Sequence, residues 1–123
     1  MTHGFEIKNG VGFINGKPRE DAEAISDDRG TQGYRRQIIV KFVAGYKLSI
    51  VFGIYAYCSN REPDLGGHGF NENCEDAEIA ILEPSGEFHE MPDWGDQVLG
   101  WQTPEEVLEW IEFVRDLDAK VEA

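Results

Sequence analysis

Two cysteines and two histidines near the middle of this sequence carry side chains that bind metal ions. Thiolate sulfur and imidazole nitrogen are preferred ligands of Zn²⁺, and four of them complete its tetrahedral shell. The candidates are Cys58, His68, Cys74 and His89. Their spacing matches no zinc-finger pattern and includes no Cys-x-x-Cys pair, and Cys58 ends an apolar stretch where a buried structural thiol is common. We expect no cofactor, with zinc bound to these four residues as the alternative.

The glycine-rich stretch between these residues offers two further chemistries. Oxygen ligands for Ca²⁺ are present, but not in the order of an EF-hand; they are Asp64, Asn71, Asn73, Glu75 and Asp76. The run Gly66-Gly67-His68-Gly69 lacks the Gly-Lys-Ser/Thr of a phosphate loop, and the acidic residues around it repel phosphate. Ordinary polar loop residues explain the stretch more simply. Since no nucleophile elbow or paired catalytic histidine is present either, we expect no enzymatic activity.

The strongest signal in this sequence is the uneven distribution of charge along the chain. Residues 1–61 carry nine Lys/Arg and six Asp/Glu, whereas residues 62–123 carry two and eighteen, so charges of +3 and −16 sum to the net −13. An acidic half of this size favours basic partners and argues against direct binding of nucleic acid.

Four carboxylates, which we call the acidic stripe, are predicted to line one face of a C-terminal helix. They are Glu105, Glu109, Glu112 and Asp116. Steps of three or four residues space them by about 4.5–6 Å, close to the phosphate spacing of a nucleic-acid strand. The stripe lacks the interspersed Lys residues that usually support an exposed helix. Mimicry of a nucleic acid and a plain solvated helix face both remain open interpretations.

Further residues before this helix extend the predicted surface. Asp93 and Asp96, with Glu87 and Glu90, add negative charge. Trp94 and Trp101 are expected to be exposed beside the helix, and Trp is favoured where proteins bind partners. Trp101 has an alternative role as the N-terminal partner of a hydrophobic staple.

The helix that positions the stripe has clear boundaries. Thr103 is predicted as the N-cap, Pro104 as the first helical residue, and Glu106 as the third, which completes a capping box. The opposite, apolar face is predicted to contain Val107, Trp110, Ile111, Val114, Leu117 and Val121.

The preceding residues alternate as strands do. Asn9-Gly10 predicts a hairpin turn within residues 5–14, and Asn15-Gly16 closes that segment. Residues 35–42 and 46–57 are expected to form the central hairpin of the sheet, with a bulge or a close backbone approach at Gly53. Residues 77–82 and 87–91 are expected to form a further pair of strands. A short helix near residues 20–25 and a mobile loop are expected within 17–33, with disorder as the alternative. The result is a single α+β domain over residues 1–123: an antiparallel sheet of about four to six strands packed against one C-terminal helix.

Composition supports one globular domain. Hydrophobic residues make up 41% of 123 residues and aromatics 11%, too many for a disordered acidic chain. No secretory signal or membrane span is recognised, and two cysteines do not make a disulfide framework, although one Cys58–Cys74 bridge stays open. These features predict a cytoplasmic protein.

Part of the sequence resembles a group of phage proteins. The residues that carry the resemblance are Tyr46-x-Leu48-Ser49-Ile50-x-Phe52-Gly53, Tyr57-Cys58-Ser59-Asn60, AEIAIL at 77–82, and Gly100-Trp101-x-Thr103-Pro104-Glu105-Glu106-Val107. Over residues 46–110 the chain is similar to small uncharacterised proteins of tailed bacteriophages and prophages. The resemblance implies an acidic phage protein acting in the host cytoplasm, where inhibitors of host defence or transcription recur.

Three functions follow as hypotheses. The first is a non-enzymatic inhibitor that blocks a basic, nucleic-acid-handling host protein through the acidic stripe, with Trp94 or Trp101 at its edge. The second is a structural or accessory phage module that self-associates, and the third is a metal-dependent enzyme.

Overall fold

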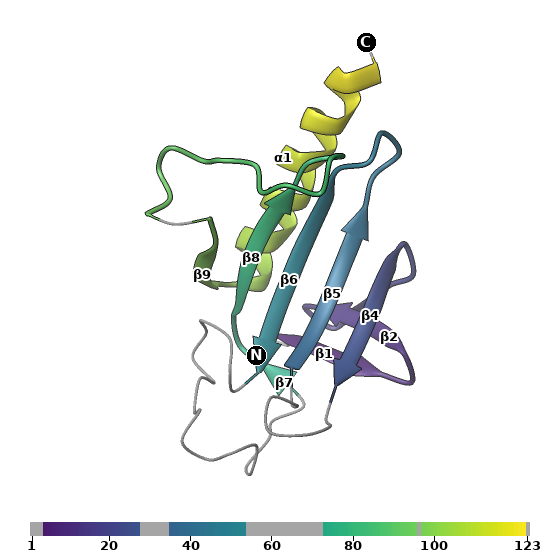
Figure 1. Cartoon of the computed structure of the whole chain (residues 1–123). Helices are drawn as coiled ribbons and strands as arrows, with labels where there is room; N and C mark the ends of the chain where they lie inside the picture. The colour runs from purple at the N-terminus through teal and green to yellow at the C-terminus, as the bar shows by residue number, and fades with distance from the viewer. Residues whose placement is uncertain (1–3, 28–34, 54–72, 96, 123) are drawn as a thin grey trace.

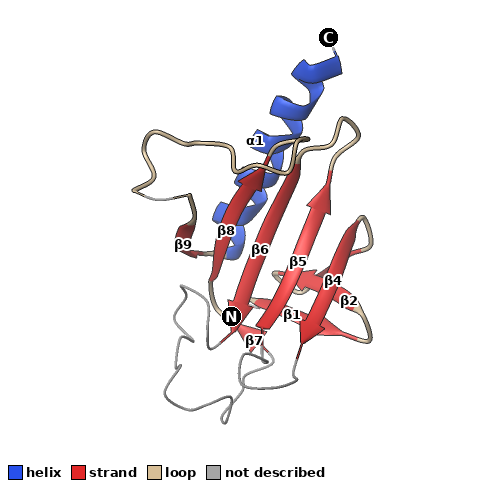
Figure 2. Cartoon of the chain, in the orientation of Figure 1, coloured by secondary structure: helices blue, strands red, loops and turns tan. Residues whose placement is uncertain are grey.

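The protein, described here by a computed structural model covering residues 4–27, 35–53, 73–95 and 97–122, folds as two antiparallel sheets and a helix (Figures 1 and 2). The larger sheet has the order β4-β5-β6-β8-β9, formed by Ala22–Asp27, Arg35–Lys41, Lys47–Gly53, Ala77–Leu82 and Leu99–Gln102. The smaller sheet has the order β3-β2-β1-β7, formed by Lys17–Arg19, Val11–Ile14, Phe5–Lys8 and Asn73–Cys74. The helix α1 spans Pro104–Glu122. The predicted α+β class with one C-terminal helix is confirmed, and the larger sheet has five strands, within the predicted four to six. That the N-terminal hairpin would belong to a second sheet was not predicted.

Asn-Gly pairs close both turns of the smaller sheet. Asn9 and Asn15 adopt φ values of 52° and 55°, and the glycine after each is also at positive φ. This backbone turns the chain tightly, so Lys8 pairs with Val11 and Ile14 with Lys17.

The central hairpin forms as predicted. Ile38 pairs with Ile50 and Val40 with Leu48, and all four side chains are buried on one face of the sheet. Pairing with β5 continues without a shift to Gly53, so of the two alternatives predicted there the bulge is wrong. The register shift lies between β8 and β9. Residues 54–57 of the predicted strand lie outside the described residues.

Both the smaller sheet and α1 cover this same face. Phe5 packs against Phe52 with ring centroids 5.8 Å apart, and Val107, Ile111 and Val114 of α1 are buried in the same core. The capping box is confirmed, because the Thr103 amide donates to Glu106 Oε1 at 3.0 Å and the Glu106 amide to Thr103 Oγ at 3.3 Å.

Several sequence predictions are wrong, each for a physical reason. Residues 20–25 form the start of β4 and the turn before it rather than a helix, because pairing with β5 outweighs local helix propensity. Residues 28–33 of the expected mobile loop lie outside the described residues. Val121 is exposed, since the end of α1 projects beyond the sheet (Figure 1). Residues 87–91 make only a single bridge, between Leu82 and Phe88, and the edge of the sheet is β9 instead.

Gly12 lies at a point where the two sheets approach each other closely. A Cβ built on it would lie 2.7 Å from Cγ1 and 2.8 Å from Cδ1 of Ile38. Gly12→Ala should therefore push Ile38 out of its packed position and cost about 2 kcal/mol of unfolding free energy. Urea denaturation checks this value, with Gly95→Ala as the control, because a Cβ at Gly95 meets nothing within 4 Å. Equal stability of the two variants would mean that the sheets do not pack this closely.

Candidate partner-binding surface

The acidic stripe lies on the solvent side of α1. The helix buries Val107, Ile111 and Val114 against the sheet, which turns the opposite side outward. All four stripe carboxylates, Glu105, Glu109, Glu112 and Asp116, are exposed as predicted. The fold thus presents them as one row along a rigid helix.

No cation of the described residues forms an ion pair with this row. The ion pairs of Lys8 with Glu6, Arg19 with Asp21, and Lys41 with Glu23 all lie in the basic half of the chain. In the described part of the chain no ion pair involves a stripe carboxylate. Its charge is therefore available to an external cation.

An aromatic cluster borders the stripe on one side. Trp94 meets Trp110 edge-on with ring centroids 5.2 Å apart, and Trp110 meets Phe113 in the same way at 5.3 Å. We call these three residues the aromatic flank. The indole N–H of Trp110 donates to Gln102 Oε1 at 3.0 Å, and the Gln102 amide group donates to the Gly100 carbonyl at 3.3 Å. These two bonds hold the Trp110 ring between β9 and the helix.

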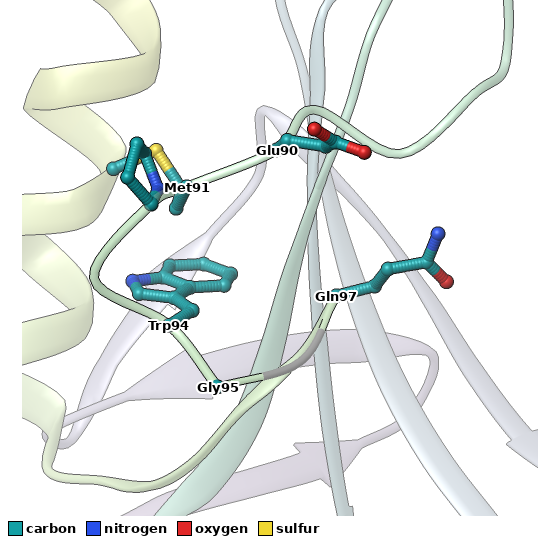
Figure 3. Close-up of a pocket in the computed structure, with 6 residues that line it drawn as sticks. Glu90, Met91, Trp94, Gly95 and Gln97 are labelled. Carbon is teal, nitrogen blue, oxygen red and sulfur yellow. The ribbon is translucent and has the colours of Figure 1, made fainter.

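Two open hollows adjoin this cluster, one lined by Trp94 and the other by Trp110 and Phe113. The first, of about 390 Å³, is formed by the connector that precedes β9 and is lined by Glu90, Met91, Pro92, Trp94, Gly95 and Gln97 (Figure 3). The second, of about 380 Å³, lies between β9 and α1 and is lined by Leu99, Gln102, Glu106, Glu109, Trp110 and Phe113. Glu109 belongs both to the acidic stripe and to the second hollow. Aromatic surface and negative charge are therefore contiguous at this point of the helix.

The predicted tryptophans differ in their surroundings. Trp94 was expected to be exposed, but only 8% of its surface is accessible, because its ring packs against Trp110. Trp101 is 56% exposed as expected, which argues against its alternative role in a hydrophobic staple. It is also held at φ = 54°, a left-handed conformation that bulky residues rarely adopt. Strain of this kind is concentrated at functional sites.

The structure places most of the remaining site residues and adds others. Asp93, Glu87 and Glu90 are exposed, whereas Asp96 lies outside the described residues. Phe113, Gln102 and Glu106 were not predicted as site residues. Their signal in the sequence was weak: Phe113 follows Trp110 by three positions, at the boundary between the acidic and apolar faces of the helix.

The two candidate zinc ligands that lie within the described residues, Cys74 and His89, are not close to each other. Cys74 lies in β7, before β8 begins, whereas the His89 amide donates to the Ile81 carbonyl near the other end of β8. His89 Nδ1 contacts Glu83 Oε2 at 2.9 Å. Cys58 and His68, and the Asp64 and Asn71 of the calcium alternative, lie outside the described residues, as does any Cys58–Cys74 bridge. In the described residues no three His, Cys, Asp or Glu side chains group as a metal site.

We compared the chain with known protein families, curated proteins and solved structures. No protein-family model, curated protein or solved structure matches this chain. The helix α1, the only one in the described residues, is not long and apolar enough to cross a membrane.

Proposed function

We propose that this protein is a non-enzymatic, phage-encoded inhibitor that binds a basic, nucleic-acid-handling host protein in the cytoplasm. A defence or transcription complex is the expected kind of target. The observation that carries the proposal is the exposed row of carboxylates on α1, with which no cation of the described residues forms an ion pair. A rigid row of charges at about 4.5–6 Å intervals can occupy a groove that otherwise holds a phosphate backbone.

Electrostatics sets how such a complex behaves. Attraction between the net −13 chain and a basic groove accelerates association and makes it strongly salt-dependent. Trp101 supplies apolar area at the edge of the contact, of the kind that dominates many interfaces. The same charge repels nucleic acid, so the protein itself binds none.

Capture from bacterial lysate tests the proposal. The tagged protein is incubated with nuclease-treated lysate at about 50 mM and 500 mM salt, and bound proteins are identified by mass spectrometry. We expect a nucleic-acid-binding protein at low salt, released by high salt and by added DNA or RNA. Capture that resists both salt and nucleic acid would contradict nucleic-acid mimicry.

Self-association is the second candidate, favoured by one observation on the larger sheet. Helix α1 and the smaller sheet both cover the face that carries Ile38 and Ile50, while the other face carries the half-buried Ile39, Val51 and Leu82. Light scattering separates the candidates: a stable oligomer that persists at high salt favours the structural module, and a monomer favours the inhibitor.

A further inference from the structure

The hollow between β9 and α1 combines aromatic and acidic side chains in its lining. One side is aromatic, formed by Trp110 and Phe113, and two carboxylates of the helix, Glu106 and Glu109, also line it. Leu99 completes the apolar part. A hollow with aromatic walls and negative charge suits an organic cation, because the electron-rich ring faces and the carboxylates attract it together.

We infer that this hollow binds an arginine side chain of the basic partner. The inference rests on the proposed function and specifies how that partner is recognised. A guanidinium is planar, stacks on aromatic rings, and accepts partial dehydration more readily than the ammonium of lysine. An apolar side chain would fit less well, since it would take two carboxylates out of water without compensation.

The site is arranged before a ligand arrives. Trp110 is fixed by its bond to Gln102 and by edge-on contacts with Trp94 and Phe113. Glu106 is held by the capping box, through its Oε1 contacts with Thr103. Fixed groups lose little conformational entropy on binding, so even one side chain can be selected.

Glu109 connects the hollow with the acidic stripe. Because it lines the one and belongs to the other, a basic segment that follows the stripe along α1 passes directly over the hollow. The stripe would supply attraction for any positive charge, whereas the hollow would distinguish arginine from lysine.

Two blocked peptides, hexa-arginine and hexa-lysine, test this inference. We expect hexa-arginine to bind more tightly by up to about fivefold in calorimetry, which is the full worth of one exposed aromatic–cation contact, because the guanidinium stacks on the rings and the ammonium stays hydrated. Adding it should also shift the NMR signal of the Trp110 indole N–H. Equal affinity for the two peptides, or an unshifted Trp110 signal, would overturn the inference.

Matched variants test whether the hollow is responsible for the preference for arginine over lysine. Glu109→Gln and Glu112→Gln remove the same charge from the same helix, but only Glu109 lines the hollow. Glu109→Gln should remove most of the arginine preference, and Glu112→Gln should weaken both peptides equally and leave the preference intact. Phe113→Ala, which changes no charge, should also reduce it. If Glu109→Gln and Glu112→Gln behave alike, the hollow is not the site.

Failure here is distinguishable from failure of the proposed function. If the two peptides bind equally well while reversal of the charges at Glu112 and Asp116 abolishes partner binding, the inhibitor proposal is supported and the arginine site is rejected. If the arginine preference is present while charge reversal leaves the affinity for the partner unchanged, the arginine site is supported and nucleic-acid mimicry is rejected.

Discussion

Asp118→Ala is expected to be the most destabilising single substitution described here, with a loss of about 3 kcal/mol of unfolding free energy. Asp118 is only 5% exposed, near the end of α1. Its carboxylate accepts the Ala44 amide at 2.9 and 3.1 Å and the Tyr46 amide at 3.1 Å. These bonds attach the helix to the β5–β6 turn. Alanine would leave both amides without a partner, so the melting temperature should fall by roughly 10 to 15 °C.

Calorimetric melting of three variants checks this explanation. Asp118→Asn keeps one acceptor oxygen and should lose about 1 kcal/mol. Asp116→Ala removes an exposed carboxylate of the same helix and should change stability by less than about 0.5 kcal/mol. An Asp118→Ala protein as stable as the Asp116→Ala protein would mean that the carboxylate does not hold the turn.

Charge reversal on the stripe is expected to have the largest effect on function. The double variant Glu112→Lys/Asp116→Lys should bind the basic partner about 50-fold more weakly at low salt, because two attractive charges become repulsive. Both side chains are exposed, so the circular dichroism spectrum should not change. Surface plasmon resonance measures the affinity, and the loss should fall mainly on the association rate.

The matched control reverses two carboxylates elsewhere. Glu20 and Glu75 are exposed and lie outside α1, and Glu20→Lys/Glu75→Lys changes the net charge by the same amount, from −13 to −9. This control should weaken binding by less than about threefold. If both double variants bind equally poorly, net charge alone governs binding and the stripe has no special role.

Local sequence signals predicted the parts of the fold that depend on local chemistry. Asn9-Gly10 closes a turn because both residues accept positive φ, and the Thr103–Glu106 capping box starts the helix through its own hydrogen bonds. Strands that form mainly by pairing with another strand were harder to predict from the sequence. Residues 22–27 become a strand by pairing with β5, and β9 forms at the edge of β8, although neither has a strongly alternating pattern.

The candidate surface was likewise predictable from the sequence only in part. The exposure of the acidic stripe follows from helix periodicity, which the sequence contains. The aromatic flank does not, because it depends on how the connector folds back to place Trp94 against Trp110. The burial of Asp118 was equally hidden, since its position on the apolar face is explained only by the β5–β6 turn that it binds.

Competition with nucleic acid tests nucleic-acid mimicry most directly. The captured partner is purified, and its affinity for this protein is measured while the concentration of the partner's own DNA or RNA ligand is raised. We expect the apparent dissociation constant to rise in proportion to the nucleic-acid concentration, with no ternary complex, because the stripe and the phosphate backbone occupy the same groove. A ternary complex whose affinity does not change with nucleic acid would contradict the account.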